Sequence, residues 1–216
     1  MNFELLAEIP LFKGMKPAEL ENVLRSISSL TKKFTKDEVI YHAGDHIKEL
    51  GIVIFGSVQI ENIDILGNKS ILGIAQTGDV FAESYACIPD QPLMVDVIAR
   101  EASEILFINV LRMMQDTSSD YSNIIIRNLL RISSRKNQAL SMRIFHSSPK
   151  TIRARVVSYF SEQVTCQGTN DITIPLDRQQ LADYLGVDRT ALSKELSKMK
   201  SDGLIDYHKN KFRIMV

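Results

Sequence analysis

Apolar residues in the first half of the chain come in short runs separated by turn residues. The breaks contain glycine, aspartate and asparagine, as in Gly44-Asp45 and Gly67-Asn68. Short strands joined by such turns are typical of a β-sandwich or small barrel, whose inward-facing side chains can enclose a ligand. A short amphipathic helix is predicted before them, at 17–27. The predicted strands are 38–41, 51–54, 57–63, 69–74, 95–99 and 103–108.

The pattern changes to one long helix from about Ser118 to Phe145, without glycine or proline inside it. The helix carries a wide apolar stripe. This width predicts that one side of the helix packs on the barrel, while the other side pairs with the same helix of a second subunit as a coiled coil. The alternative is a helix buried in its own domain, but so much apolar surface favours a homodimer. Two series of residues in this stripe repeat every seven positions. The first is Ile125, Ile132 and Ala139, and the second is Ile126, Ser133 and Leu140. Leu129, Leu130 and Ile144 lie beside them.

The stretch 146–149 reads His-Ser-Ser-Pro, which ends the long helix and predicts a hinge. A helix over 150–163 follows, then a short strand at 172–174. Its expected core face consists of Ile152, Val156, Val157 and Phe160.

Two short helical patterns meet at Gly186, which is suited to the positive φ of a sharp turn. Asp177 and Gln180 have the spacing of a capping box, and Asp188 can cap the second helix. Apolar arms at 204–207 and 212–215 predict a hairpin after the second helix. This order indicates a winged helix-turn-helix. The apolar positions are Leu181, Ala182, Leu185, Leu192, Leu196 and Met199.

The polar face of the second helix carries side chains that can hydrogen-bond base edges and phosphates in a major groove. We expect further phosphate contacts from the start of the first helix and from the hairpin tip. A plain helical hairpin with solvated charges is the alternative. The predicted DNA-binding residues are Arg178, Gln179, Arg189, Thr190, Ser193, Lys194, Lys209 and Lys211.

Composition adds a charge asymmetry to this picture. The 216 residues have no net charge, but 1–116 hold 10 Lys and Arg against 17 Asp and Glu, 117–147 hold 5 against 1, and 148–216 hold 11 against 8. Positive charge in the last hundred residues fits a polyanionic partner there. With no apolar run of membrane length, no signal-peptide pattern and two distant cysteines, we expect a cytoplasmic protein with no membrane contact.

The chain resembles the CRP/FNR family of bacterial transcription regulators over nearly its full length. The resemblance rests on Gly44-Asp45, the stretch from Gly78 to Ala99, the long helix, and the helix-turn-helix with its wing. It implies an α+β fold: a jelly-roll barrel of the cyclic-nucleotide-binding type (1–116), a dimerisation helix (117–147) and a winged helix (148–216). It further implies a homodimer that binds a palindromic DNA operator, works with RNA polymerase and is switched by a small molecule, a redox event or a metal cofactor.

Departures from the family's sequence pattern limit which small molecules can be the effector. Members that bind cyclic AMP have Gly-Glu and later Arg-Ser in their phosphate cassette, where this chain has Ala82-Glu83 and Leu93-Met94. A cyclic phosphate buried without its arginine would be an unpaired charge, so we expect an effector other than cyclic AMP. A roll without any ligand is the alternative. The candidate effector residues are Ala82, Glu83, Ser84, Tyr85, Leu93 and Met94.

Cofactor sites are poorly supported. No cysteine precedes Cys87, which excludes the N-terminal iron–sulfur cluster of oxygen-sensing members. His42 and His46 leave a haem open, although surface or hydrogen-bonded histidines explain them more simply. Cys87 is either an oxidant sensor or a small buried hydrophobe. We expect no cofactor and no bound metal.

On the recognition helix, Thr190 and Lys194 replace the glutamate and arginine that many members use for a TGA-type half-site. Threonine cannot accept from cytosine as a carboxylate does, and lysine lacks the guanidinium fork, so we expect Arg189 to be the main base reader. Glu195 stands where an apolar residue is usual. The resemblance suggests that effector binding rotates the winged helices about 145–149.

Two other classes of function remain open. The first is a cupin-like ligand-binding module or enzyme without a DNA role, although the chain lacks the clustered His/His/Glu/His set expected of a cupin-like metalloenzyme. A winged helix that contacts protein is the second. The regulator interpretation, and not an enzyme, is the prediction.

Overall fold

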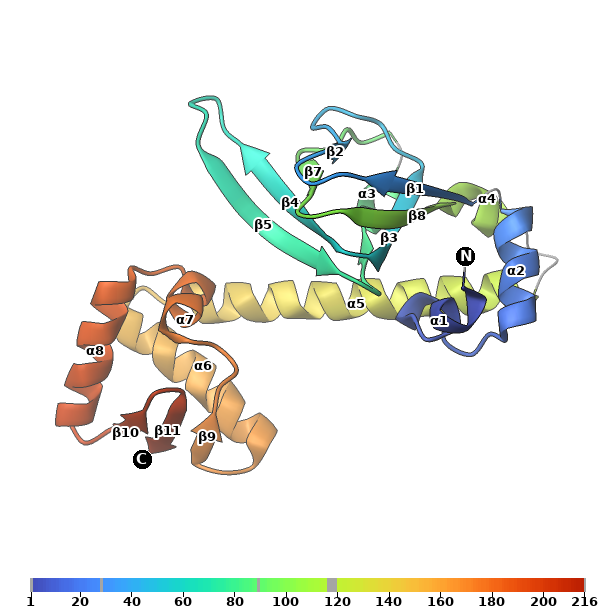
Figure 1. The fold of residues 1–216 in the computed structure, drawn as a ribbon. Helices are drawn as coiled ribbons and strands as arrows, with labels where there is room; N and C mark the ends of the chain where they lie inside the picture. Colours follow the sequence, from blue (N-terminus) through green and yellow to red (C-terminus); the bar gives the residue numbers. More distant parts are fainter. Residues whose placement is uncertain (1, 28, 89, 116–119, 216) are drawn as a thin grey trace. The chain divides into compact units, whose positions relative to one another are not determined.

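Two four-stranded antiparallel sheets form the β-roll of the N-terminal half (Figure 1). One sheet has the strand order β1-β8-β3-β6 and the other β2-β7-β4-β5. This computed structural model describes residues 2–27, 29–88, 90–115 and 120–215. The strands are β1 (Leu30–Phe34), β2 (Val39–Tyr41), β3 (Glu49–Phe55), β4 (Ser57–Ile63), β5 (Lys69–Gln76), β6 (Val80–Phe81), β7 (Asp96–Ala99) and β8 (Ser103–Asn109).

Strands β3 and β8 are buried on both faces, which explains their nearly continuous apolar sequence. Val53 and Ile105 point between the two sheets, whereas Ile52 and Leu106 pack against helices on the outside. Gly51 is required on β3, because the ring of Phe81 occupies the space that a Cβ there would take.

Apart from the short helix α3, the helices come from the two ends of the N-terminal unit, which spans residues 1–134. Ile125 and Leu129 of the long helix are buried in their core, and the Asn128 side chain donates hydrogen bonds to the carbonyls of Leu11 (3.0 Å) and Lys13 (2.8 Å). The helices are α1 (Phe3–Ala7), η1 (Pro10–Phe12), α2 (Pro17–Ser26), α3 (Glu83–Ala86), α4 (Val110–Gln115) and α5 (Asp120–Ser147).

The C-terminal unit spans residues 135–216 and folds around a core of its own. The three-stranded sheet β10-β11-β9 packs with helices α6, α7 and α8 (Figure 1). A hydrogen bond from the Ala154 amide to the Thr151 hydroxyl caps α6. Its elements are α6 (Ile152–Gln167), β9 (Asp171–Thr173), α7 (Arg178–Leu185), α8 (Arg189–Ser201), β10 (Ile205–His208) and β11 (Lys211–Ile214).

The α+β fold class is confirmed: an antiparallel β-roll, a long helix and a winged helix-turn-helix follow in the expected order. The expected start of the long helix at Ser118, and the boundary at 116/117, lie outside the described residues. Val157 was expected in the core but is exposed, because the buried face of α6 is formed by Val156, Tyr159 and Phe160. Strands β1 and β6 were not expected. None of the described helices has the length and apolarity of a membrane span.

A candidate DNA-binding surface and the β-roll interior

The two helices of the C-terminal unit are fixed by their caps. The Asp177 carboxylate accepts from the Gln180 amide, and the Gln180 side chain accepts from the Asp177 amide, both at 2.8 Å. Gly186 has φ 63°, and the Asp188 carboxylate caps α8 by accepting from the Ala191 amide at 2.8 Å. The local sequence therefore sets where α8 begins, at Arg189, directly after the cap Asp188.

Helix α8 has one buried and one solvent-facing side. Leu192, Leu196 and Met199 are buried in the domain core. On the other side, Arg189, Thr190 and Lys194 are exposed, and Ser193 is half-buried with its hydroxyl donating to the Arg189 carbonyl at 2.9 Å. The four predicted base-contacting residues therefore share one accessible side. Such a side is what a major groove requires of a recognition helix.

Arg178, at the start of α7, lies over two rings of the wing. Its Cζ is 5.2 Å from the ring centre of Tyr207 and 5.6 Å from that of Phe212. Burial lowers the pKa of the Arg178 guanidinium, and the nearby positive charge of Arg189 acts in the same direction. The charge of Tyr207 acts the other way and raises this pKa. Arg178 and Arg189 thus both add positive charge near the start of the two helices, which favours a bound polyanion.

The wing turns through a strained lysine. Lys209 has φ 55°, a conformation that costs a lysine more than a glycine. Its neighbour Asn210 fixes the turn, since the Asn210 side chain donates to the Ile174 carbonyl at 3.0 Å and the Ile174 amide donates to the Asn210 carbonyl at 3.0 Å. Lys209 and Lys211 are both exposed.

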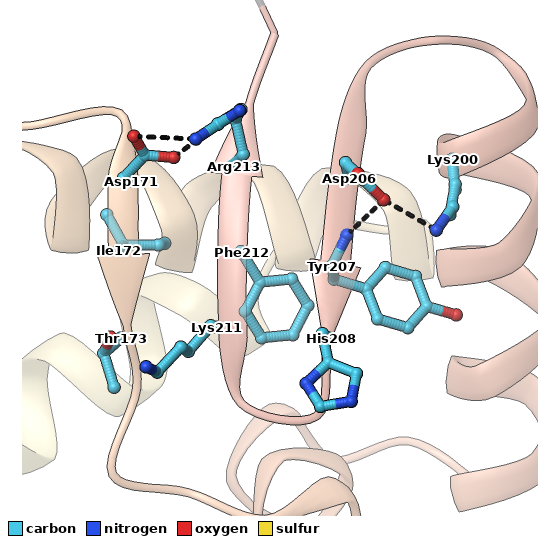
Figure 2. A pocket seen from close by; sticks show the side chains of 10 residues that line it. All are labelled: Asp171, Ile172, Thr173, Lys200, Asp206, Tyr207, His208, Lys211, Phe212 and Arg213. Carbon is cyan, nitrogen blue, oxygen red and sulfur yellow. Dashed lines mark hydrogen bonds and ion pairs between the residues drawn. The ribbon is translucent and has the colours of Figure 1, made fainter.

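Acidic groups at the base of the wing are neutralised. The Asp206 carboxylate lies 2.6 Å from Lys200 Nζ, and this hydrogen bond holds the pKa of the Asp206 carboxyl below its usual value. Asp171 pairs with Arg213 at 2.6 Å. Figure 2 shows both pairs away from the turn, whereas His208 and Lys211 lie toward it. The turn end of the wing is therefore its positive end.

Gln179 lies on the exposed side of α7, where its side-chain amide donates to the Asp183 carboxylate at 2.8 Å. Glu195, unusual for its position, has a partner that the sequence did not reveal. Its carboxylate lies 2.6 Å from Arg153 Nε on α6, and Arg153 also binds Asp202 at 2.8 Å. The pair joins α8 to α6 and accounts for a carboxylate at a half-buried position.

In the β-roll, Ala82 directly precedes helix α3 and has φ 59°, the left-handed backbone that glycine would adopt freely. Glu83 is buried, Ser84 is exposed and Tyr85 is half-buried. The Tyr85 hydroxyl accepts a long hydrogen bond from the Met94 amide at 3.4 Å. Tyr85 and Leu93 therefore pack in the core between the sheets, Glu83 is buried on helix α3, and Ser84 is exposed.

Leu93 is only 1% exposed and belongs to the apolar core between the sheets. Its backbone is held from both sides, by its amide donating to the Asp45 carbonyl at 2.9 Å and its carbonyl accepting from the Gly44 amide at 2.7 Å. Met94 is 65% exposed, so its side chain does not line the interior as expected. Both residues lie in the loop before β7, where Leu93 alone packs between the sheets and Met94 points to solvent.

The candidate cofactor residues do not assemble into a site. Among the described residues, no three histidine, cysteine, aspartate or glutamate side chains are grouped to hold a metal ion. His42 is exposed and lies 3.8 Å from the Asp96 carboxylate. Cys87 is exposed rather than a buried hydrophobe, and desolvation, followed by the charge of Glu83, raises the pKa of its thiol. A raised pKa makes the reactive thiolate rarer.

The end of α5 is packed into the winged helix. His146 is fully buried, with Nδ1 2.9 Å from the Ser158 hydroxyl and Nε2 2.9 Å from the Glu162 carboxylate on α6. Arg143 donates to the carbonyl of Asp183 on α7 at 3.0 Å. The expected hinge at 145–149 is therefore not a free joint, because the residues just before and within it are bound to the C-terminal unit.

Two family models match the chain in succession. A cyclic nucleotide-binding domain matches residues 31–116, and a Crp-like helix-turn-helix domain matches residues 154–216. The chain belongs to the CRP/FNR family of transcription regulators. As a CRP/FNR regulator it combines a sensor domain of the cyclic-nucleotide-binding type with a helix-turn-helix that binds DNA, and it is not an enzyme.

Relatives of the CRP/FNR chain agree with this assignment. A probable transcriptional regulator, flp, of Lacticaseibacillus casei is 22% identical over 97% of this chain and 93% of its own. The structure of CprK complexed with OCPA superposes with a TM-score of 0.63 at 18% identity, over 90% of this chain and 91% of that one. The c-di-GMP-responsive regulator CLP of Xanthomonas campestris gives 0.53 at 20% identity, over 93% and 100%. These likenesses confirm the fold.

Proposed function

We propose that this protein is a homodimeric, sequence-specific regulator that binds a palindromic operator and responds to a small molecule or redox signal other than cyclic AMP. Its functional segments are 1–116 for sensing, 117–147 for dimerisation and 148–216 for DNA binding. We include RNA polymerase as its partner and the cytoplasm as its location, since a bacterial regulator acts where transcription takes place.

The exposed basic side of α8 is the observation that carries the DNA-binding role. We assign Arg189 to base reading, with Thr190, Ser193 and Lys194 in support, because all four are accessible at the start of one helix. Arg178, Gln179, Lys209 and Lys211 are assigned to phosphates. The positive charge of Arg178 over the rings of the wing, and a lysine kept at the strained turn of the wing, both support an anionic partner.

The dimer proposal rests on the two sides of α5. Ile125 and Leu129 are buried in their own unit, whereas Leu130 is 66% exposed, Leu140 61% and Ile144 65%. These exposed residues fall on one series with alternating spacings of four and three, the seam of a coiled coil. The whole series is Ile126, Leu130, Ser133, Asn137, Leu140 and Ile144.

Asn137 supports a two-stranded coiled coil in particular. The seam has two polar residues, Ser133 and Asn137, and only Asn137 carries an amide that can both donate and accept across the interface. A buried Asn in a largely apolar seam specifies register and oligomeric state at some cost in stability. A second copy of the same helix is the occupant that this seam fits, because Asn137 then meets an identical amide across the twofold axis.

The effector proposal rests on Leu93. At the place where cyclic-nucleotide-binding relatives have arginine, this chain has a side chain buried in apolar core. Because Glu83, Tyr85 and Leu93 supply one carboxylate, one hydroxyl and an apolar wall, we propose a small organic effector with an apolar body.

The proposed function is tested by selecting duplexes from a random-sequence pool with the purified protein. We expect enrichment of an inverted repeat whose half-sites lie one helical turn apart, about 34 Å. Recovery of no preferred sequence, together with salt-insensitive retention on heparin, would refute it in favour of a protein partner.

A further inference from the structure

Arg155 on α6 binds three backbone carbonyls from two separate segments. Its Nε donates to the Pro149 carbonyl at 2.8 Å, and its Nη1 donates to the carbonyls of Leu185 (2.8 Å) and Gly186 (2.9 Å). Three of the five guanidinium N–H groups are thereby used inside the domain. The side chain is half-buried and is not among the residues that sequence reasoning selected.

Two of these carbonyls lie at the C-terminal end of α7, where a helix leaves carbonyls without partners and carries partial negative charge. The amides of Gly186 and Val187 satisfy the carbonyls of Asp183 and Ala182 through the left-handed cap, and Arg143 adds a bond to Asp183. Leu185 and Gly186 face Arg155 instead. A cationic fork matches this end of the helix in both charge and geometry.

The carbonyls that Arg155 binds belong to the turn that directs the recognition helix. Gly186 is followed by Val187 and the cap Asp188, and then by Arg189. An error in the direction of this turn displaces the start of α8, while the core contacts of Leu192 and Leu196 hold its later turns. We infer that Arg155 is a positioning residue for operator recognition, acting through the placement of Arg189.

The same side chain fixes the start of the DNA-binding segment, because Pro149 lies between the end of α5 at Ser147 and the start of α6 at Ile152. One guanidinium therefore keeps the chain entering α6 in a constant relation to the α7–α8 turn. Lysine has a single ammonium and cannot span both segments with the same geometry. If arginine is required here, then Arg155 acts by holding the two segments in place and not only by its positive charge.

The inference rests on the proposed DNA-binding function, and its test separates the two. We compare wild type with Arg155→Ala and Arg155→Lys, each with Arg189 intact and with Arg189→Ala. Binding is measured by anisotropy on a duplex that the wild type selects from random DNA and on poly(dI-dC), well below every melting temperature. Hydrogen exchange at Gly186 and Val187 reports the turn without DNA.

Arg153→Ala is the matched control. It lies on the same helix and is half-buried, but it binds the side chains of Glu195 and Asp202 rather than the turn. We expect this variant to lower the melting temperature while the ratio of specific to non-specific affinity stays within about twofold.

For Arg155→Ala we expect faster exchange at the turn and a loss of specific affinity of about tenfold or more, the scale of losing a base reader. Binding to poly(dI-dC) should change little, and Arg155→Lys should recover only part of the loss. In the Arg189→Ala background the loss should largely disappear, since the two changes act on one contact.

Unchanged exchange at the turn, additive losses, full rescue by lysine, or an equal loss of specificity in Arg153→Ala would each overturn the inference. Wild-type protein that selects no sequence would instead refute the proposed function. The exchange result then still shows whether Arg155 holds the turn.

Discussion

The guanidinium of Arg178 lies over the ring of Tyr207, with Cζ 5.2 Å from the ring centre, and so joins the start of α7 to strand β10 of the wing. One residue thus carries two separable properties. Its stem and plane pack on aromatic rings, and its charge stands beside that of Arg189.

Arg178→Met should separate these properties, because methionine keeps apolar packing over the rings and removes the charge. We expect weaker binding to all DNA sequences alike and a salt slope shallower by about one unit. Affinities measured across a salt series test this. A loss confined to the selected operator would assign Arg178 to base reading.

Arg189→Ala should cost about 1–3 kcal/mol of operator affinity and relax the preference at one base pair of each half-site. Non-specific affinity should fall much less. Gel-shift titration with the selected duplex and its single-base variants measures both effects. Unchanged operator affinity would remove Arg189 from the interface.

Lys209→Gly should leave the domain as stable as before or slightly stabilise it, because glycine adopts φ 55° without strain. Affinity for every sequence should nevertheless fall, since a phosphate contact is lost. Melting and anisotropy on the same samples test the two halves of this prediction. Lys36→Gly, in the β-roll, serves as a charge-matched control for DNA affinity.

Leu140→Glu should break the proposed dimer without unfolding the subunit, because this side chain is already exposed in the single chain. Two like charges in the seam of a coiled coil repel one another and lose apolar contact. Sedimentation equilibrium should show monomers. Arg135→Glu, five residues earlier on the opposite side of the helix, should leave the dimer intact.

Cyclic AMP at millimolar concentration should not shift the melting temperature, because buried Leu93 offers no charge to a cyclic phosphate. Tight binding would stabilise the protein by about 4 kcal/mol at a thousandfold excess over Kd, a shift of several degrees. Calorimetry with and without the nucleotide decides. A shift of that size would contradict the effector proposal.

Sequence patterns predicted the elements whose side chains alternate or repeat strongly. The caps at Asp177 and Asp188 were found because the residue types themselves specify the geometry. Strand β1 was missed because three consecutive polar residues, one Thr and two Lys, lie within Leu30–Phe34. Its side chains are exposed or half-buried, so the strand shows no apolar alternation. Strand β6 has only two residues, too few for any period.

Contacts between distant residues were the other limit. Glu195 could not be explained from the sequence because its partner Arg153 is far away along the chain. Arg155 gave no signal at all, since backbone carbonyls, its partners, are present at every position. Met94 was placed inward with Leu93, but both lie in a loop outside any strand, so no alternation in the sequence shows which of the two side chains faces the core.

The buried ring of His146 also determines where the DNA-binding half can be cut from the rest. A truncation that begins at Ser148 discards the partner of Ser158 and Glu162, and strips a covering ring from Tyr159. An isolated winged-helix domain should therefore be expressed from about Arg135 onward, so that the last turns of α5 still cover its core.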